Sequence, residues 1–130
     1  MNILIVDDDE DDRNLFCDAV NVVDPEINCI IARNGEEALQ GMLTDHLPKP
    51  DLIFLDLNMP RINGVQCLRE IKKQQRLRDI PVVIYTTSKL EEDKVITRKL
   101  GAIHFITKPS SLRELCNEIE FSINKVRVTS

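Results

Sequence analysis

The sequence predicts an open, doubly wound α/β domain made of five consecutive β-strand and α-helix units, (βα)5. Short apolar runs alternate along the chain with segments whose apolar residues recur at helical spacing. The apolar runs are continuous, which is typical of strands covered on both faces of a parallel sheet. The chain has 130 residues, whereas a closed barrel of eight such units needs roughly 250.

Five apolar runs are predicted to be strands, and an amphipathic helix is predicted after each. The runs are residues 3–6, 27–32, 52–55, 82–85 and 103–106. The apolar positions of the helices are, in chain order, Leu15, Ala19 and Val22; Ala38 and Met42; Leu68 and Ile71; Val95, Ile96 and Leu100; and Leu112, Leu115, Ile119, Ile123 and Val126. We take residues 1–126 as one domain and 127–130 as a short polar tail.

Several residues mark the expected helix ends. Three of them stand three positions before a glutamate, the spacing of a capping box, and these are Asn34, Ser88 and Ser111. Pro48 and Pro50 separate the second helix from the third strand, and Gly101 stands where a glycine would end the fourth helix. The boundaries agree with one helix after each strand.

Units of this length favour the flavodoxin-like strand order 2-1-3-4-5, with helices on both faces of the sheet. In that order the winding reverses between the first and third strands, and ligands bind at the carboxyl ends of the strands beside the reversal. Functional residues are therefore expected just after residues 6 and 55.

Composition disfavours several functions. The formal net charge is −5, which disfavours binding to nucleic acid or to anionic lipid. Apolar residues make up 42% of the chain and charged residues 30%, a balance typical of a packed globular domain. The first apolar run is too short for a signal peptide, and no apolar stretch approaches the ~20 residues of a membrane span, so we expect a soluble cytoplasmic protein.

The four cysteines stand far apart, with no CxxC pair and no Cys/His cluster. They are Cys17, Cys29, Cys67 and Cys116. Neither a zinc site nor a redox motif is indicated, and we interpret all four as reduced core residues.

Acidic residues gather at the predicted reversal of the sheet. Asp7, Asp8 and Asp9 follow the first strand at once, and Asp56 follows the third. Converging carboxylates repel one another unless a cation sits among them, and oxygen ligands favour a hard cation such as Mg²⁺. We therefore predict a magnesium site at Asp7, Asp8 and Asp56. Asp9 and the acids at 10–12 are interpreted as first-turn residues of the first helix, where the helix dipole favours negative charge.

A hydroxyl and an ammonium are expected at the same edge of the sheet. Thr86 ends the fourth strand, and Lys108 follows the fifth, with Pro109 next to it. A lysine there can balance the charge of a phosphoryl group, and a threonine hydroxyl can donate a hydrogen bond to one of its oxygens. An aspartate in this environment can act as a nucleophile toward phosphorus. Taken singly, Thr86 fits a strand residue and Lys108 a solvated lysine, whereas together they favour a site.

This ordered set of residues resembles the receiver domain of bacterial two-component response regulators, in the CheY-like superfamily. The residues that carry the resemblance are Asp7-Asp8, Asp56 within the segment FLDLNMP, Gly64, Thr86 and Lys108-Pro109. It extends from the first strand to the fifth helix, and the separations of Asp56 from Thr86 and from Lys108 match the family.

The resemblance implies that Asp56 accepts a phosphoryl group from a phosphohistidine on a sensor histidine kinase or phosphotransfer protein. It also implies that Asp8, Asp56 and the main-chain carbonyl of Asn58 bind Mg²⁺ directly, and that Asp7 binds it directly or through water. Lys108 would contact the phosphoryl oxygens. Gly64 would allow a tight loop, and the turn before Pro109 would be cis-like. Such a domain assists its own phosphorylation and dephosphorylation but is not a metabolic enzyme.

A switch follows from the same resemblance. Phosphorylation would draw Thr86 inward and leave space that an aromatic residue on the fifth strand, Phe105, can fill. Many relatives have tyrosine there, so an output that depends on the tyrosine hydroxyl is not expected, and Phe105 also fits a plain core residue. Thr87 is bulkier than the usual family residue and would restrict access, while Asn58 and Ser88 stand at positions that tune hydrolysis of the acyl phosphate.

No output domain follows the last helix, so a stand-alone receiver is expected. It would signal to its partner through the face made of the fourth helix, the fifth strand and the fifth helix. The segment 85–88 and the long connection 72–81 are similar to receivers that serve phytochrome-type kinases. A homodimer through the same face would use Leu90, Val95 and Phe121, although each of these also fits a core residue.

Two other functions are alternatives at this point. A phosphatase of the haloacid-dehalogenase type also uses a strand-end aspartate with Mg²⁺, but it normally has a second aspartate where this chain has Asn58, and it needs a cap domain. A receiver-like module that binds partners without phosphorylation would be indicated by failure to bind Mg²⁺. A nucleotide-binding domain is disfavoured because the loop after the first strand is acidic and has no glycine-rich phosphate cradle.

Overall fold

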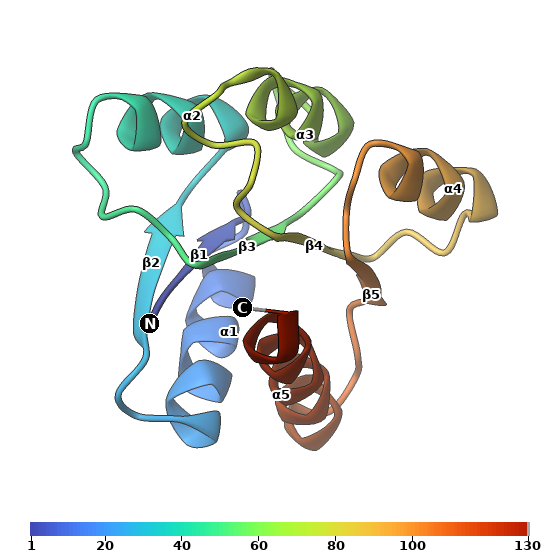
Figure 1. Ribbon diagram of the computed structural model, residues 1–130. Helices are drawn as coiled ribbons and strands as arrows, with labels where there is room; N and C mark the ends of the chain where they lie inside the picture. The colour runs from blue at the N-terminus through green and yellow to red at the C-terminus, as the bar shows by residue number, and fades with distance from the viewer. Residues whose placement is uncertain (130) are drawn as a thin grey trace.

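A computed structural model describes residues 1–129 as a five-stranded parallel sheet with helices on both faces (Figure 1). The strands are β1 (Asn2–Val6), β2 (Asn28–Ala32), β3 (Leu52–Leu55), β4 (Val82–Thr86) and β5 (His104–Thr107). The helices are α1 (Glu10–Val23), α2 (Gly35–Leu43), α3 (Gly64–Lys73), α4 (Glu91–Lys99) and α5 (Leu112–Thr129). The strand order is β2-β1-β3-β4-β5, which confirms the predicted topology.

The continuous apolar strands divide their side chains between two cores, because successive residues of a strand point to opposite faces. On β3, Ile53 and Leu55 join the core beneath α2 and α3, whereas Leu52 and Phe54 join the core against α1 and α5. Figure 1 shows α1 and α5 together on one face of the sheet, and α2, α3 and α4 on the other. Both faces are covered, as the sequence pattern predicts.

Helix α1 buries a different stripe from the predicted one. Leu15 is 43% exposed and Val22 is 65% exposed, while Phe16 and Val20 are fully buried. The Phe16 ring packs against Phe54 of β3 with centroids 4.7 Å apart, and this aromatic contact sets the rotation of the helix. Two more residues assigned to apolar helix faces, Val95 and Leu112, are also exposed.

The predicted caps are confirmed at two helices and wrong at a third. Asn34 accepts a hydrogen bond from Glu37 N at 2.7 Å, and Ser111 accepts one from Glu114 N at 3.1 Å. Helix α4 has Leu90 as its N-cap with no side-chain cap, because the Ser88 hydroxyl donates to Asp93 instead.

Two helix ends carry further capping features. A capping box that the sequence analysis missed, Asn63 with Gln66, begins α3. Gly101 ends α4 with φ at 103°, as predicted.

The C-terminal segment is helical where a tail was expected. Helix α5 continues to Thr129, so residues 127–129 belong to it, and residue 130 lies outside the described residues. Val126 is buried, and Arg127 pairs with Asp24 at 3.5 Å, which holds this turn against the end of α1. None of the described helices is long and apolar enough to cross a membrane.

The prediction that all four cysteines are reduced is wrong for two of them. Cys17 of α1 and Cys29 of β2 form a disulfide, with Cα atoms 5.8 Å apart. The sequence does not reveal this pairing, because only the packing of α1 beside β2 brings the two residues together. Cys67 and Cys116 are free, and burial raises the pKa of the Cys67 thiol to about 12.

Candidate functional site

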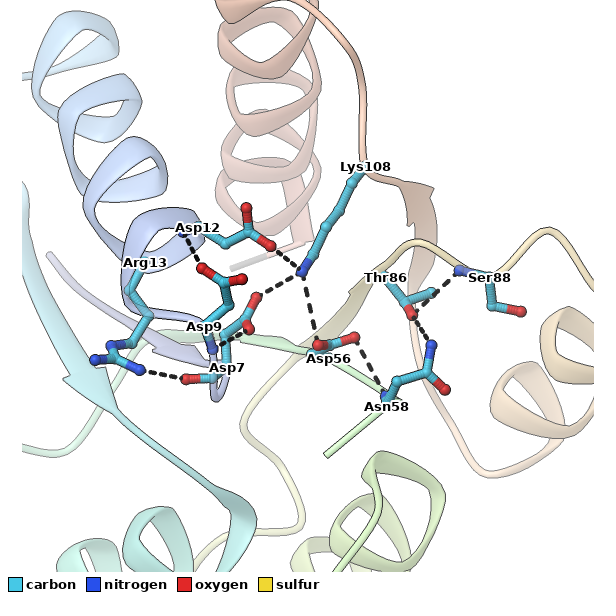
Figure 2. Close-up of polar contacts among 9 residues, drawn as sticks. All are labelled: Asp7, Asp9, Asp12, Arg13, Asp56, Asn58, Thr86, Ser88 and Lys108. Atoms are coloured by element: carbon cyan, nitrogen blue, oxygen red, sulfur yellow. Dashed lines mark hydrogen bonds and ion pairs between the residues drawn. The ribbon is translucent and has the colours of Figure 1, made fainter. Parts of the chain in front are cut away.

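Polar residues from four strand ends meet at the carboxyl edge of the sheet. Asp7 follows β1 and Asp56 follows β3, Thr86 is the last residue of β4, and Lys108 follows β5. Asp7 and Thr86 are fully buried, and Asp56 is 4% exposed, whereas Asp8 is exposed. Figure 2 shows Lys108 on one side of Asp56 and Thr86 on the other. The predicted convergence of these residues is confirmed.

Main-chain hydrogen bonds fix the backbone positions of the residues that carry these side chains. Asp7 N donates to Ala32 O at 3.1 Å, and Asp56 N donates to Val6 O at 3.0 Å. Lys108 N donates to Thr86 O at 2.7 Å. Each bond carries the parallel ladder one residue beyond its strand, so the first residue of each loop keeps a fixed position relative to its neighbour.

The ammonium of Lys108 lies among three carboxylates. Its Nζ is 2.7 Å from Asp12 Oδ2, 2.8 Å from Asp7 Oδ2 and 3.6 Å from Asp56 Oδ2. Burial works against the charged form, but the hydrogen bonds to Asp12 and Asp7 and the charge of Asp56 outweigh it, so the pKa of Lys108 is raised. The lysine therefore remains a cation at neutral pH.

Asp7 is the carboxylate at the base of the site. Its Oδ1 accepts from Asp9 N at 3.0 Å, and its main-chain oxygen accepts from the buried Arg13 Nη1 at 2.9 Å. Burial raises the pKa of Asp7, and the hydrogen bonds from Lys108 and Asp9 oppose that rise without cancelling it. Three carboxylates lie around one ammonium, so the lysine alone does not balance the charge of the site.

The arrangement fits a divalent cation. One carboxylate oxygen each from Asp7, Asp8 and Asp56 lie within 4.8 Å of one another. Oxygens on opposite sides of a Mg²⁺ or Ca²⁺ ion are about 4 to 5 Å apart, so a single ion can contact all three. Because Asp8 is exposed, the cluster is open to solvent on that side. These residues can hold a divalent metal.

Thr86 forms the opposite wall of the site. Its Oγ1 accepts from Asn58 Nδ2 at 3.5 Å and from Ser88 N at 3.3 Å. Asn58 N donates to Asp56 Oδ1 at 3.3 Å, so Asn58 links Asp56 to Thr86. Both bonds to Thr86 use lone pairs of its oxygen, and the O–H proton is what the residue can offer to an anion beside Asp56.

Gly64, the first residue of α3, lies against the main chain of Asp56. A Cβ at this position would meet Leu57 Cα at 2.5 Å and would overlap the main-chain oxygen of Asp56. Gly64 N also donates to Leu57 O at 3.0 Å. Glycine is therefore required by space, and the loop after Asp56 turns tightly into α3 as the sequence analysis predicts.

Residues 3–120 match the family model of the response regulator receiver domain. The chain belongs to this family. It is thus a receiver domain of two-component signal transduction, and the predicted family and function class are confirmed.

The relatives of this receiver domain include one protein of similar length and others that are about twice as long. The chain is 34% identical to response regulator Rcp1 of Synechocystis over 91% of its own length and 83% of Rcp1. It is 36% identical to the phosphate regulon transcriptional regulatory protein PhoB of Pseudomonas aeruginosa over 87% of its length, but spans only 47% of PhoB. The chain therefore spans about half the length of such transcriptional regulators.

Two solved structures share this fold closely. The phosphorylated cyanobacterial phytochrome response regulator RcpA superposes with a TM-score of 0.88 at 30% identity, over 99% of this chain and 95% of RcpA. The Mn²⁺-bound form of Rcp1 gives a TM-score of 0.82 at 32% identity, over 92% of this chain and 89% of that one.

The remaining predicted positions lie around this receiver site or behind it. Thr87 is exposed, and Ser88 is half-buried beside Thr86. The peptide bond before Pro109 is trans, so the cis-like turn is wrong for this structure. Phe105 is half-buried on β5 opposite Ile84, and Lys94 of α4 lies over its ring.

The part that α1 plays in the site was not predicted from the sequence. Asp9 caps α1, as the interpretation of its acids expects. Asp12, in contrast, binds Lys108, and Arg13 holds the main chain of Asp7. Their spacing offered a signal, because residues three and four positions along from Asp9 lie one turn further along the helix and on the same face.

Proposed function

We propose that this receiver domain takes a phosphoryl group on Asp56 from the phosphohistidine of a sensor histidine kinase or phosphotransfer protein. One observation carries the proposal: Asp56 is a buried carboxylate between a lysine ammonium and a threonine hydroxyl, next to an acidic cluster that fits a metal ion. Each neighbour has a use in forming an acyl phosphate.

The transfer needs one bond formed and one broken. An Asp56 carboxylate oxygen attacks phosphorus, a P–O bond forms, and the P–N bond to the donor imidazole breaks; the imidazole leaves with its electron pair and takes a proton. Lys108, 3.6 Å from Asp56 Oδ2, lies close enough to pair with the phosphoryl oxygens after a small side-chain movement. Thr86 donates its hydroxyl proton to another of these oxygens.

Mg²⁺ is the metal that we propose for the site. Asp7, Asp8, Asp56 and the main-chain carbonyl of Asn58 would hold it, and oxygen ligands of this kind suit Mg²⁺. When bound, it neutralises charge that develops on the phosphoryl oxygens. The burial of Asp7 beside two other carboxylates supports the choice of a metal site, because a second cation stabilises their charge.

The same residues support a relay rather than turnover of an external substrate. A haloacid-dehalogenase-type phosphatase would place a second acid two residues after Asp56, but Asn58 stands there, with its amide directed at Thr86. We therefore propose that the domain assists only its own phosphorylation and dephosphorylation. Asn58, Thr87 and Ser88 border the site and would set the lifetime of the acyl phosphate.

Intact mass spectrometry tests this proposal. The protein is incubated with acetyl phosphate and Mg²⁺, and the expected result is the gain of one phosphoryl group. Asp56→Asn and a metal-free sample should show no gain, whereas the matched control Asp18→Asn, an exposed acid on α1, should behave as wild type. A phosphorylated Asp56→Asn variant would overturn the assignment of the acceptor. Failure of the wild type to bind Mg²⁺ would favour a module that acts without phosphorylation.

A phytochrome-type kinase is the partner that we propose. RcpA, described as a cyanobacterial phytochrome response regulator, matches nearly the whole of this chain, and this supports the proposal. The test compares phosphotransfer from two purified, phosphorylated kinases, one of the cyanobacterial phytochrome type and one of the phosphate-sensing type. Faster transfer from the phytochrome-type kinase is expected, and a preference for the other kinase would contradict the assignment.

A homodimer through the face of α4, β5 and α5 is proposed as well. Leu90, Val95 and Phe121 are 57%, 43% and 51% exposed, so the alternative that they are core residues is wrong. Sedimentation of the wild type and of Val95→Asp with Phe121→Asp should show a dimer that the double variant loses. A wild type that stays monomeric with and without a phosphoryl analogue would contradict the dimer.

A further inference from the structure

Lys108 is held by a carboxylate that lies outside the proposed metal ligands. Its Nζ is 2.7 Å from Asp12 Oδ2 but 3.6 Å from Asp56 Oδ2, and only 11% of the lysine side chain is exposed. The ammonium also lies over the Tyr85 ring, 5.3 Å from its centroid. Figure 2 shows Asp12 on the far side of Lys108 from Asp56, so a hydrogen bond to Asp12 pulls the ammonium away from the acceptor.

The main chain around Asp12 occupies a fixed position, because two hydrogen bonds hold the first turn of α1. Asp12 N donates to Asp9 Oδ1 at 3.0 Å, and Arg13 Nη1 donates to Asp7 O at 2.9 Å. The main chain of Lys108 is also fixed, by its hydrogen bond to Thr86 O. The position of the ammonium therefore depends on the conformation of the lysine side chain, which donates to Asp12 and Asp7 and stays 3.6 Å from Asp56.

We propose that Asp12 is a positioning residue that holds Lys108 away from Asp56 in the resting protein and thereby opposes the phosphorylated state. The inference rests on the proposed function of Asp56. Asp7 also holds Lys108, but a metal ion bound to Asp7 would compete for that carboxylate. Asp12 is not needed as a metal ligand, so it continues to attract Lys108 after the metal is bound. Contact of Lys108 with a phosphoryl oxygen then requires weakening of the Asp12 hydrogen bond.

The test uses beryllofluoride, a stable analogue of the phosphoryl group, at saturating Mg²⁺. Isothermal titration calorimetry measures its dissociation constant for wild type, for Asp12→Asn and for Asp11→Asn. Asp11 is an exposed acid of the same helical turn, so its variant makes the same change of net charge. We expect Asp12→Asn to bind about tenfold more tightly than wild type, and Asp11→Asn to match wild type. A merely structural defect would weaken binding instead.

A second pair of variants tests whether Asp12 acts through Lys108. In the Lys108→Ala background, Asp12→Asn should leave the dissociation constant unchanged, because the lysine that it positions is gone. An equal gain with and without Lys108, or no gain in Asp12→Asn, would overturn the inference while the proposed function stands. A wild type that does not bind beryllofluoride would overturn the proposed function and the inference with it.

Discussion

At the residue scale, the charge of Asp7 links stability to metal binding. Burial raises its pKa above the ordinary value of 3.8, so the folded protein holds the proton more tightly than the unfolded chain. The contribution of Asp7 to the free energy of unfolding is therefore present below about pH 3.8 and is lost as the pH rises through the folded-state pKa. Once ionised, the Asp7 carboxylate is a buried charge that a divalent cation can stabilise.

We expect Mg²⁺ to stabilise the protein far more at neutral than at acidic pH. At a concentration 100 times its dissociation constant, Mg²⁺ should add about 2.7 kcal/mol to the free energy of unfolding near neutral pH. The gain should shrink near about pH 4, because a protonated Asp7 is a poor ligand. Urea unfolding with and without Mg²⁺ measures both values. Equal gains at the two pH values, or an undiminished gain in Asp7→Asn, would contradict the assignment of Asp7 as a ligand.

Gly64 gives a second prediction at this scale. Gly64→Ala places a methyl group against the main chain of Asp56 and Leu57, which cannot move without displacing the acceptor. We expect a loss of about 3 kcal/mol or more in the free energy of unfolding. Gly41→Ala is the matched control, because its methyl group would meet the side chain of Leu47, which can change rotamer. Similar losses in the two variants, measured by urea unfolding, would contradict this account.

At the element scale, α1 connects the disulfide to the site. Cys17 lies one turn beyond Arg13 on α1, and its disulfide with Cys29 ties the helix to β2, at the edge of the sheet. The loop that the disulfide closes is short, with a sequence separation of 12. A disulfide that closes a loop of this size lowers the conformational entropy of the unfolded chain. In this entropic account it raises the free energy of unfolding by about 3 kcal/mol.

We therefore expect reduction with dithiothreitol to lower the free energy of unfolding of the wild type by about 2–3 kcal/mol. Cys17→Ser with Cys29→Ser should unfold identically with and without the reductant. Cys116→Ser, which leaves the disulfide intact, should lose stability on reduction as the wild type does. The measurement is urea unfolding of each protein in both redox states, and a wild type indifferent to reduction would show that the two thiols are not paired in solution.

Elements that depend on neighbouring residues in the sequence could be predicted, whereas features that depend on contacts between distant residues could not. The strands and their order follow from runs such as 52–55, which are apolar at every position and therefore need cover on both faces. The rotation of α1 did not follow, since Phe16 is buried through an aromatic contact with Phe54, a residue far away in sequence. The disulfide and the Asp12 hydrogen bond to Lys108 were missed for the same reason, because each joins elements whose distance only the fold decides.

In the candidate site, too, the positions set by strand ends could be predicted, whereas the partners chosen by side chains could not. Asp7, Asp56 and Lys108 could be placed together because the end of a parallel strand fixes where the next residue points. Which carboxylate Lys108 prefers could not be predicted, since its long side chain can reach several. The uncapped start of α4 was also missed, because the Ser88 hydroxyl binds Asp93 rather than the end of the helix.

At the scale of the whole molecule, β4 and β5 connect the site to the proposed partner surface, because Thr86 ends β4 and β5 is part of that surface. Thr86 borders the site, and its main-chain partner on the neighbouring strand is Thr107. Two residues earlier on β5, Phe105 is half-buried and pairs with Ile84, and Lys94 of α4 lies 5.9 Å from the centroid of its ring. A movement of Thr86 toward Asp56 can therefore reach α4 through β5.

The last prediction concerns this coupling. Beryllofluoride with Mg²⁺ should change hydrogen exchange in α4 and β5 of the wild type, because Thr86 leaves Ser88 N for the bound analogue and Phe105 repacks behind it. Thr86→Ser keeps the hydroxyl and should retain the change, whereas Thr86→Ala should bind the analogue but lose the response in α4. Exchange measured peptide by peptide, with α2 as the internal reference, distinguishes these outcomes. An unaltered response in Thr86→Ala would show that the conformational change reaches α4 without Thr86, since no hydroxyl would remain to be drawn inward.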